Sequence, residues 1–276
     1  MKKVIFLFLI TSCVHPLIAQ MINPTEKKKP LDGIVDHTKS MTMKALPYAP
    51  VRAADILWEK RIWRVIDTRE KINLTFRYPK MPLFTILEKG IKEGQITAYS
   101  PEDEHFSTPM DTAALFAQLY QKDTVEITDV VTGLSHLQVV ENSIDPEDIK
   151  YYRLKEIWYF DTRESTLKVR ILGIAPVMDV KGESGNVRYK KVLFWLYYPH
   201  CRDLLASHEV FNPNNDFGRM TWEDLFEMRY FSSHIMKESN IRDDRLQAMY
   251  SGTDLLLKAE EIEQQIFNFE HDLWSY

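Results

Sequence analysis

The stretch from Tyr152 to Gly218 constrains the fold of this chain more than any other part of its sequence. It contains three strand-like segments, at residues 154–160, 167–175 and 192–198. The third segment is apolar almost throughout, which is typical of a strand with both faces covered, so we expect it at the centre of a sheet. The short connections between the segments favour an antiparallel meander.

Helices are expected around this meander. Apolar residues recur at helical spacing in three places before it, and two shorter runs have the length of single strands. The helices are predicted at 55–71, 82–94 and 110–121, and the strands at 95–99 and 125–131. Because helix and strand alternate here, residues 51–145 could form a small α+β sub-unit, followed by a second one at 146–276.

The C-terminal part of the chain is predicted to be helical. Thr221 and Asp224 have the spacing of a capping box at a helix start. In the final predicted helix, which opens at Gly252, an apolar stripe must be buried against the domain or against a partner. This stripe consists of Leu255, Ala259, Ile262, Ile266 and Phe269. The predicted fold class is α+β, with a central antiparallel meander, flanking helices and a helical C-terminal segment.

The N-terminus indicates export. Two lysines precede an apolar run at residues 4–10, and Ala19 followed by Gln20 provides a small residue at a signal peptidase site. We therefore predict a signal peptide at residues 1–19 and a soluble mature protein. The apolar run is shorter than the roughly 20 residues that span a bilayer, so we expect no transmembrane helix.

One alternative lies inside this signal sequence. Residues 10–13 end in Cys13 and have the shape of a lipobox, in which the cysteine is acylated and becomes the first mature residue. The apolar run before Cys13 is short for a lipoprotein signal, and apolar sequence resumes after it. A lipid-anchored periplasmic binding protein therefore stays open as an alternative to cleavage after Ala19.

Residues 20–50 have the sequence of an arm. They contain three lysines at positions 27–29 and prolines at positions 30, 47 and 50, and they show neither helical nor strand periodicity. Such sequence is typical of flexible segments. We therefore predict that the folded domain occupies residues 51–276.

The sequence contains no local signature of an active site or of a bound cofactor. It has no glycine-rich phosphate loop, no His-Glu-x-x-His, no Gly-x-Ser-x-Gly and no Cys or His spacing suited to zinc. We therefore predict no catalytic residue, no cofactor and no metal. The formal net charge of −5 is spread along the chain, and without a basic stripe nucleic acid is not an expected partner.

Cys201 supports the one enzymatic alternative, a secreted thiol hydrolase. It becomes the single thiol once residues 1–19 are removed, and His200 and His208 are close to it in sequence. Adjacent residues point to different sides of a helix, so His200 is poorly placed to activate the thiol. The competing interpretation is that Cys201 is a small buried residue next to the sheet.

Aromatic residues are abundant, with 6 Trp, 13 Tyr and 14 Phe. Such side chains are found most often in protein cores and next most often in interfaces, where Trp, Tyr and Arg are the residues that most often anchor a partner. The export signal, the missing active-site signature and the many aromatic residues together indicate a component of a protein assembly.

Five stretches of the sequence resemble the GldN/PorN family, and their order and the terminal block make the resemblance specific. They lie at residues 58–72, 193–202, 209–216, 237–240 and 266–274. The resemblance covers nearly all of the chain from Asp55 onward. It implies a non-enzymatic periplasmic subunit of the type IX secretion system, which is also required for gliding in motile bacteria.

The resemblance also implies partners. Proteins of this family associate with an outer-membrane lipoprotein of the GldK/PorK type in a large ring on the periplasmic side of the outer membrane. They are also thought to contact the periplasmic region of the GldM/PorM motor protein. The usual signal of the family is not lipidated, so Cys13 departs from the family pattern.

Assembly into a closed ring requires head-to-tail contacts between two different surfaces of each subunit. We expect interface surfaces on the arm, on the loop that follows the meander, and on the final helix with its aromatic end. The residues concerned are Pro47, Tyr48, Phe211, Asn212, Asn215, Ile266, Phe269, Trp274 and Tyr276.

Overall fold

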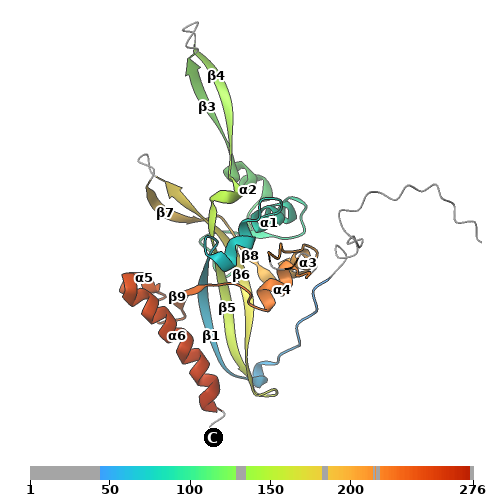
Figure 1. Ribbon diagram of the computed structural model, residues 1–276, viewed down its shortest axis with the longest axis vertical. Helices are drawn as coiled ribbons and strands as arrows, with labels where there is room; N and C mark the ends of the chain where they lie inside the picture. The colour runs from blue at the N-terminus through green and yellow to red at the C-terminus, as the bar shows by residue number, and fades with distance from the viewer. Residues whose placement is uncertain (1–43, 129–134, 182–185, 214, 216–217, 274–276) are drawn as a thin grey trace, which may run out of the picture. The chain divides into compact units, whose positions relative to one another are not determined.

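An antiparallel β-sheet forms the centre of the fold (Figure 1). The computed structural model describes residues 44–128, 135–181, 186–213, 215 and 218–273, all of which belong to one unit, Lys39–Tyr276. Among these residues the sheet has seven strands, in the order β2-β8-β6-β5-β1-β9, with β7 paired to the C-terminal part of β6. The strands are β1 (Ile56–Asp67), β2 (Ala98–Tyr99), β5 (Ile149–Asp161), β6 (Thr166–Lys181), β7 (Val187–Val192), β8 (Trp195–Tyr197) and β9 (His234–Glu238).

A hairpin and a set of helices accompany the sheet. The hairpin consists of β3 (Tyr120–Thr128) and β4 (Ser135–Ser143), which pair with each other in a separate antiparallel sheet. The α-helices are α1 (Leu83–Lys92), α2 (Thr112–Leu119), α3 (Tyr198–Ala206), α4 (Trp222–Glu227), α5 (Leu246–Met249) and α6 (Gly252–Leu273). The 3₁₀ helices are η2 (Ala53–Asp55), η3 (Lys71–Arg77) and η4 (Pro146–Asp148).

The main core lies on one face of the sheet. Alternate strand residues such as Ile66, Tyr152 and Ile174 share this face, because side chains along a strand alternate between its two sides. They pack in one cluster with residues of α1, α3 and α4. The large fully buried side chains of this cluster include Phe76, Phe84, Phe194, Trp222 and Phe226.

The opposite face carries a smaller apolar cluster and several cations. Trp63 and Tyr151 belong to this cluster, with the partly buried Phe106 packed against it. The buried lysines Lys155 and Lys237 lie 5.6 and 4.3 Å from the centre of the Trp63 ring. Cations over an aromatic face are stabilised by the ring, so this face accommodates positive charge unusually well.

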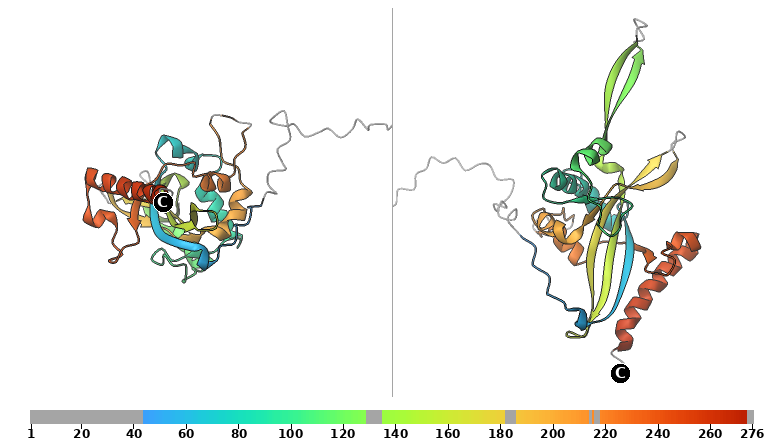
Figure 2. Two further views of the ribbon diagram at one scale, coloured as in Figure 1. Left: turned by 90° about the horizontal axis from the view of Figure 1, so that it is seen from below. Right: turned by 180° about the vertical axis from the view of Figure 1, so that it is seen from behind.

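Helix α6 covers one end of the sheet beside β9 (Figures 1 and 2). Ala259, Ile262 and Ile266 of α6 are buried against Ile62 of β1 and Ile235 of β9. The predicted apolar stripe is therefore confirmed, and it is buried against the sheet of the same chain.

Most of the predicted architecture is confirmed. The fold is α+β, β5 and β6 pair antiparallel from Ile149 to Asp161, and the C-terminal part ends in a long helix. The capping box is present, because Thr221 Oγ1 accepts from the backbone N–H of Asp224 at 3.1 Å and Asp224 Oδ2 accepts from that of Thr221 at 2.9 Å.

The prediction of a helix at 55–71 is wrong, because residues 56–67 form strand β1. The prediction rested on a helical face shared by Ile56, Leu57, Trp63 and Ile66, but in a strand Trp63 and Ile66, three residues apart, lie on opposite faces. Residues 56–67 pair with β5 on one side and with β9 on the other, which makes them a strand. Trp63 and Val65 lie on the face of the sheet opposite to the main core. Both faces of β1 therefore carry buried apolar side chains over the same stretch, with the buried Arg64 among them.

The prediction of a central strand at 192–198 is also wrong. The run is divided between the end of β7, a two-residue link, the short strand β8 and the start of α3. Strand β8 lies between β6 and the two-residue strand β2, so it is next to the edge of the sheet. Leu193, Phe194 and Leu196 are nevertheless buried, since they pack in the core with the helices rather than between central strands.

The sheet extends across the division at 145/146 between the two suggested sub-units. Strand β1 precedes this division, whereas its two neighbours, β5 and β9, follow it.

Candidate functional site

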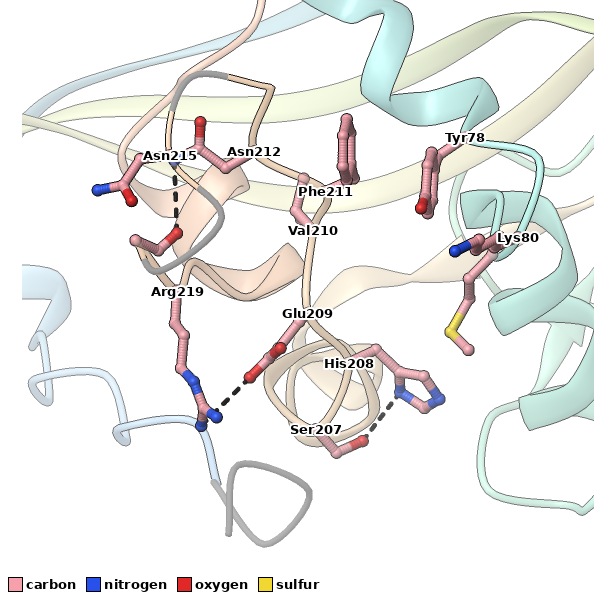
Figure 3. Close-up of a pocket in the computed structure, with 12 residues that line it drawn as sticks. Tyr78, Lys80, Ser207, His208, Glu209, Val210, Phe211, Asn212, Asn215 and Arg219 are labelled. Carbon is pink, nitrogen blue, oxygen red and sulfur yellow. Dashed lines mark hydrogen bonds and ion pairs between the residues drawn. The ribbon is translucent and has the colours of Figure 1, made fainter. Parts of the chain in front are cut away.

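Exposed apolar side chains gather where η3 and the turn after it meet the loop after α3. Residues of the segment 71–81 form the first wall of this site, and described residues between Ser207 and Met220 form the second. The two walls meet in an aromatic stack, in which the rings of Tyr78 and Phe211 are nearly parallel, with 4.4 Å between centroids and 3° between planes (Figure 3). Stacked aromatic pairs of this kind hold two loops together while leaving ring edges accessible.

Two hollows lie beside this stack. One has a volume of about 390 Å³ and includes Lys80, His208, Glu209 and Arg219 (Figure 3). The other has a volume of about 640 Å³ and includes Ile72, Leu74, Arg77 and Tyr230. Tyr78, Phe211 and Asn212 line both hollows. We call the continuous surface formed by both hollows the groove.

The groove exposes more apolar area than an isolated domain needs. Its exposed members are Ile72 (45% exposed), Leu74 (52%), Met81 (45%), Phe211 (41%) and Tyr230 (53%). Contiguous exposed apolar patches on soluble proteins mark interaction surfaces, whereas single exposed apolar residues need no explanation.

The charged groups of the groove are mostly basic. Lys71 and Arg77 line the larger hollow, and Lys80 and Arg219 line the smaller one. Glu209 lies in the smaller hollow at 3.5 Å from Arg219, so one cation is already paired. An apolar floor with a basic rim suits a partner segment that combines apolar and acidic side chains.

Helix η3, which provides part of the first wall of the groove, is held in place by buried contacts. The side chain of Asn73 in η3 is fully buried, and its Nδ2 donates to the carbonyls of Asp67 at 2.8 Å and Ser232 at 2.9 Å. Its Oδ1 accepts from the backbone N–H of Ser232 at 2.9 Å. Phe76 anchors the same helix edge-on against Trp222 in the core. A surface held in this way is preformed for binding.

The predicted interface residues of the loop lie in the groove. Phe211 and Asn212 line both hollows and Asn215 lines the smaller one. Asn212 Nδ2 donates to the carbonyl of Gly218 at 3.4 Å, which helps to shape the loop. The first wall, including Tyr78, Ile72 and Leu74, was missed by sequence analysis.

The predicted residues of the arm lie elsewhere, against α3 and α4. Pro47 is exposed, whereas Tyr48 is partly buried. The Tyr48 hydroxyl donates to Glu227 Oε1 at 2.6 Å, and Arg202 lies 3.8 Å above its ring. Burial and the Glu227 hydrogen bond raise the pKa of Tyr48 well above its usual range.

The carbonyls that follow Tyr48 are also bound by the fold. Arg170 Nη2 donates to the carbonyl of Ala49 at 2.6 Å, and Arg163 Nη2 donates to that of Pro50 at 3.0 Å. The described end of the arm is therefore attached to the domain of the same chain.

The predicted residues of the final helix are covered by the sheet. Ile266 is 4% exposed, and Phe269 stacks on Trp58 with 4.6 Å between centroids. The apolar residues that α6 exposes instead are Leu256, Leu257 and Phe267. Trp274 and Tyr276 lie outside the described residues, as do Ala19 and Gln20 at the predicted cleavage site, and Cys13.

Cys201 is a core residue of α3. It is 1% exposed, its Sγ donates to the carbonyl of Tyr197 at 3.4 Å, and burial raises the pKa of its thiol to about 12. The neighbouring His200 packs against the Tyr197 ring. A nucleophilic cysteine requires access and a lowered pKa, so the thiol hydrolase alternative finds no support at Cys201.

Two further kinds of site were sought in the part of the chain that the structure describes. No group of three or more His, Cys, Asp and Glu side chains there is arranged to hold a metal ion. None of the helices in the described ranges has both the length and the apolar character needed to cross a membrane.

The sequence of the chain was compared with known proteins and protein families. No curated protein sequence matches the chain. The family described as gliding motility associated protein GldN matches residues 51–275, which is nearly the whole chain. This family is a structural component of gliding motility and type IX secretion and is not known as an enzyme family. The chain therefore belongs to the GldN family.

Proposed function

We propose that this protein is a non-enzymatic structural subunit of the type IX secretion and gliding machinery that works in the periplasm by binding other subunits. Its mature form, after cleavage between Ala19 and Gln20, co-assembles with an outer-membrane lipoprotein of the GldK/PorK type into a large ring. The ring lies at the inner face of the outer membrane, where the protein also contacts the periplasmic region of a GldM/PorM-type motor protein.

The observation that carries this proposal is the groove around the Tyr78–Phe211 stack. Its apolar side chains are exposed, the helix η3 in its first wall is held by buried hydrogen bonds, and its charged residues are mainly basic. Interface energy concentrates in such preformed apolar centres, while rim charges select the partner and its orientation. We assign the groove to a partner segment that carries apolar and acidic residues.

The test combines the mature protein with the purified GldK/PorK-type lipoprotein and measures particle size by negative-stain microscopy and affinity by calorimetry. Leu74→Asp places a charge in the groove at a side chain that is 52% exposed, so the fold tolerates it. The matched control is Leu257→Asp on the outer side of α6, where the side chain is 59% exposed.

We expect rings from the wild-type mixture and from the control, and at least about tenfold weaker binding by Leu74→Asp, which corresponds to about 1.4 kcal/mol. Rings that form equally well with Leu74→Asp would remove the groove from the partner interface. Small particles in every mixture would contradict the ring itself.

Intact mass spectrometry of the protein exported by its native host tests the compartment and the anchor. A free N-terminus at Gln20 is expected. An acylated N-terminus at Cys13 would instead show that the protein carries its own membrane anchor.

A further inference from the structure

A second cavity, away from the groove, lies against the face of the sheet that carries Trp63 and Tyr151. Its volume is about 230 Å³. Arg153 of β5, Val65 of β1 and His234 of β9 form one row across three neighbouring strands, because Val65 pairs with both of the others. These three residues line the cavity together with Lys190 of β7 and Arg245, which immediately precedes α5. Residues far apart in sequence are thus brought to one small space.

The polar residues among the described lining of this cavity are mostly cationic. Arg153, Lys190 and Arg245 contribute three cations, His234 is a fourth basic group, and no Asp or Glu is among the described lining residues. Carboxylates lie only outside the described lining, where Asp67 acts electrostatically on Lys190 and His234, Glu70 acts on His234, and Glu104 acts on Arg153. Asp67 lies 2.6 Å from Arg69, and Glu104 lies 3.5 Å from Lys237.

Arg153 is the least exposed of the three cations, since it is half-buried whereas Lys190 and Arg245 are exposed. Its guanidinium forms no hydrogen bond or ion pair with a residue that the structure describes. Burial, and next the charge of Arg245, lower the pKa of Arg153 to about 10. Partial removal of a cation from water is unfavourable, and an anion bound beside it would offset this.

Lys190 and the apolar walls define the rest of the space. The Lys190 ammonium lies 3.6 Å from the centre of the Tyr151 ring, so it is held over the cavity wall. Val65, Val177 and Met236 provide the apolar part of the lining. The cavity is smaller than those that bind drug-sized molecules, which usually exceed about 300 Å³.

We propose that this cavity binds a small ligand through a phosphate group. Guanidinium groups match phosphate oxygens with paired N–H donors, and a dianion neutralises more of the three cations than a single carboxylate can. The apolar walls leave room for a few carbon atoms attached to the phosphate. This inference is independent of the groove and of the proposed assembly.

The experiment measures binding of inorganic phosphate and of glycerol 1-phosphate to the mature protein by calorimetry, at constant ionic strength adjusted with sodium chloride. Arg153→Gln and Arg245→Gln each remove one cation from the cavity. Their matched controls are Lys191→Gln, on the opposite face of β7 from Lys190, and Arg242→Gln, which is exposed and outside the cavity.

We expect saturable binding of at least one of the two probes, at least tenfold weaker in Arg153→Gln and in Arg245→Gln and unchanged in the controls. Tighter binding of glycerol 1-phosphate than of phosphate identifies an organic phosphate, and equal binding identifies the phosphate group alone. Because Arg245 is exposed, we expect Arg245→Gln to fold, and it tests the proposal even if Arg153→Gln does not fold. No saturable binding of either probe, or the same affinity in Arg245→Gln as in Arg242→Gln, overturns the proposal.

Discussion

The carboxylate of Glu156 lies 3.2 Å from Nε of Arg64, and neither side chain reaches solvent, with exposures of 0% and 3%. Arg229 Nη1 donates to the same carboxylate at 2.8 Å, and Trp158 Nε1 donates to it at 3.0 Å. Arg64 also pairs with Glu263 of α6 at 3.0 Å. Glu156 therefore connects β5 with β1 and with the segment after α4, and Arg64 extends this network to the final helix.

Removing this acid should destabilise the fold strongly. Glu156→Gln leaves the buried Arg64 without its buried counterion, and breaking such a pair costs about 3–5 kcal/mol. Glu59→Gln is the control, because Glu59 is exposed and its contact with Arg61, at 3.3 Å, is worth less than about 1 kcal/mol. Urea unfolding of both variants measures the difference. Equal small losses would show that the buried network contributes nothing beyond a surface pair.

Acid stability should depend on Asp161 at the end of β5. The hydrogen bond from Lys168 Nζ, at 3.0 Å, lowers the pKa of Asp161 to about 2. The pKa of an Asp side chain in an unfolded chain is about 3.9, so the unfolded chain takes up the proton first as the pH falls. Asp161 therefore stabilises the fold above about pH 4, and this contribution is lost between about pH 4 and pH 2.

The variant Asp161→Asn tests this directly. It should lower the free energy of unfolding at pH 6 and flatten its decline between pH 4 and pH 2, both measured by urea unfolding at each pH. Asp148→Asn changes an exposed acid outside this interaction and should leave the profile unchanged. An unaltered slope in Asp161→Asn would contradict the assignment.

The sequence predicts the elements whose pattern is local and misses those that pairing decides. The capping box at Thr221 and the apolar stripe of α6 can be predicted because their residues lie within a few helical turns of one another. Strand β1 could not be predicted in this way, since the spacing of Trp63 and Ile66 fits a helical face. Only the pairing of β1 with β5, far along the chain, identifies it as a strand. The position of β8 in the sheet depends in the same way on neighbours that its own apolar run cannot reveal.

The candidate site is predictable only in part for a related reason. Phe211 stands out as an aromatic residue in a loop of Asn and Pro, and the structure places it in the groove. Its stacking partner Tyr78 comes from a segment more than a hundred residues earlier, and no periodicity connects the two. The cationic cavity is equally hidden, because Arg153 and His234 become neighbours only through their shared pairing with Val65.

Cys201 should be chemically inert in the folded protein. Burial raises the pKa of its thiol to about 12, so almost no thiolate exists at pH 8. The side chain is also buried, so a thiol reagent in solution cannot reach it. Ellman's reagent should leave the mature protein unmodified at pH 8 and should react with one thiol per chain after unfolding in guanidinium chloride. Rapid reaction of the folded protein would reopen the thiol enzyme alternative. In the proposed assembly test, Cys201→Ser should give the same particles as the wild-type protein.

Tyr48 should hold the described end of the arm on the domain. Its hydroxyl bonds to Glu227 and its ring packs under Arg202, interactions worth together about 1–2 kcal/mol at a partly exposed site. Tyr48→Ala should therefore increase opening of residues 44–50 and raise the rate of tryptic cleavage after Lys44 roughly tenfold. Tyr48→Phe keeps the ring and loses the hydroxyl, so its cleavage rate should lie between those of the wild type and Tyr48→Ala.

Tyr230→Ala changes an exposed tyrosine away from the arm and serves as the control. If Tyr48→Ala is cleaved no faster than this control, the carbonyl contacts of Ala49 and Pro50 with Arg170 and Arg163 are sufficient to hold the arm.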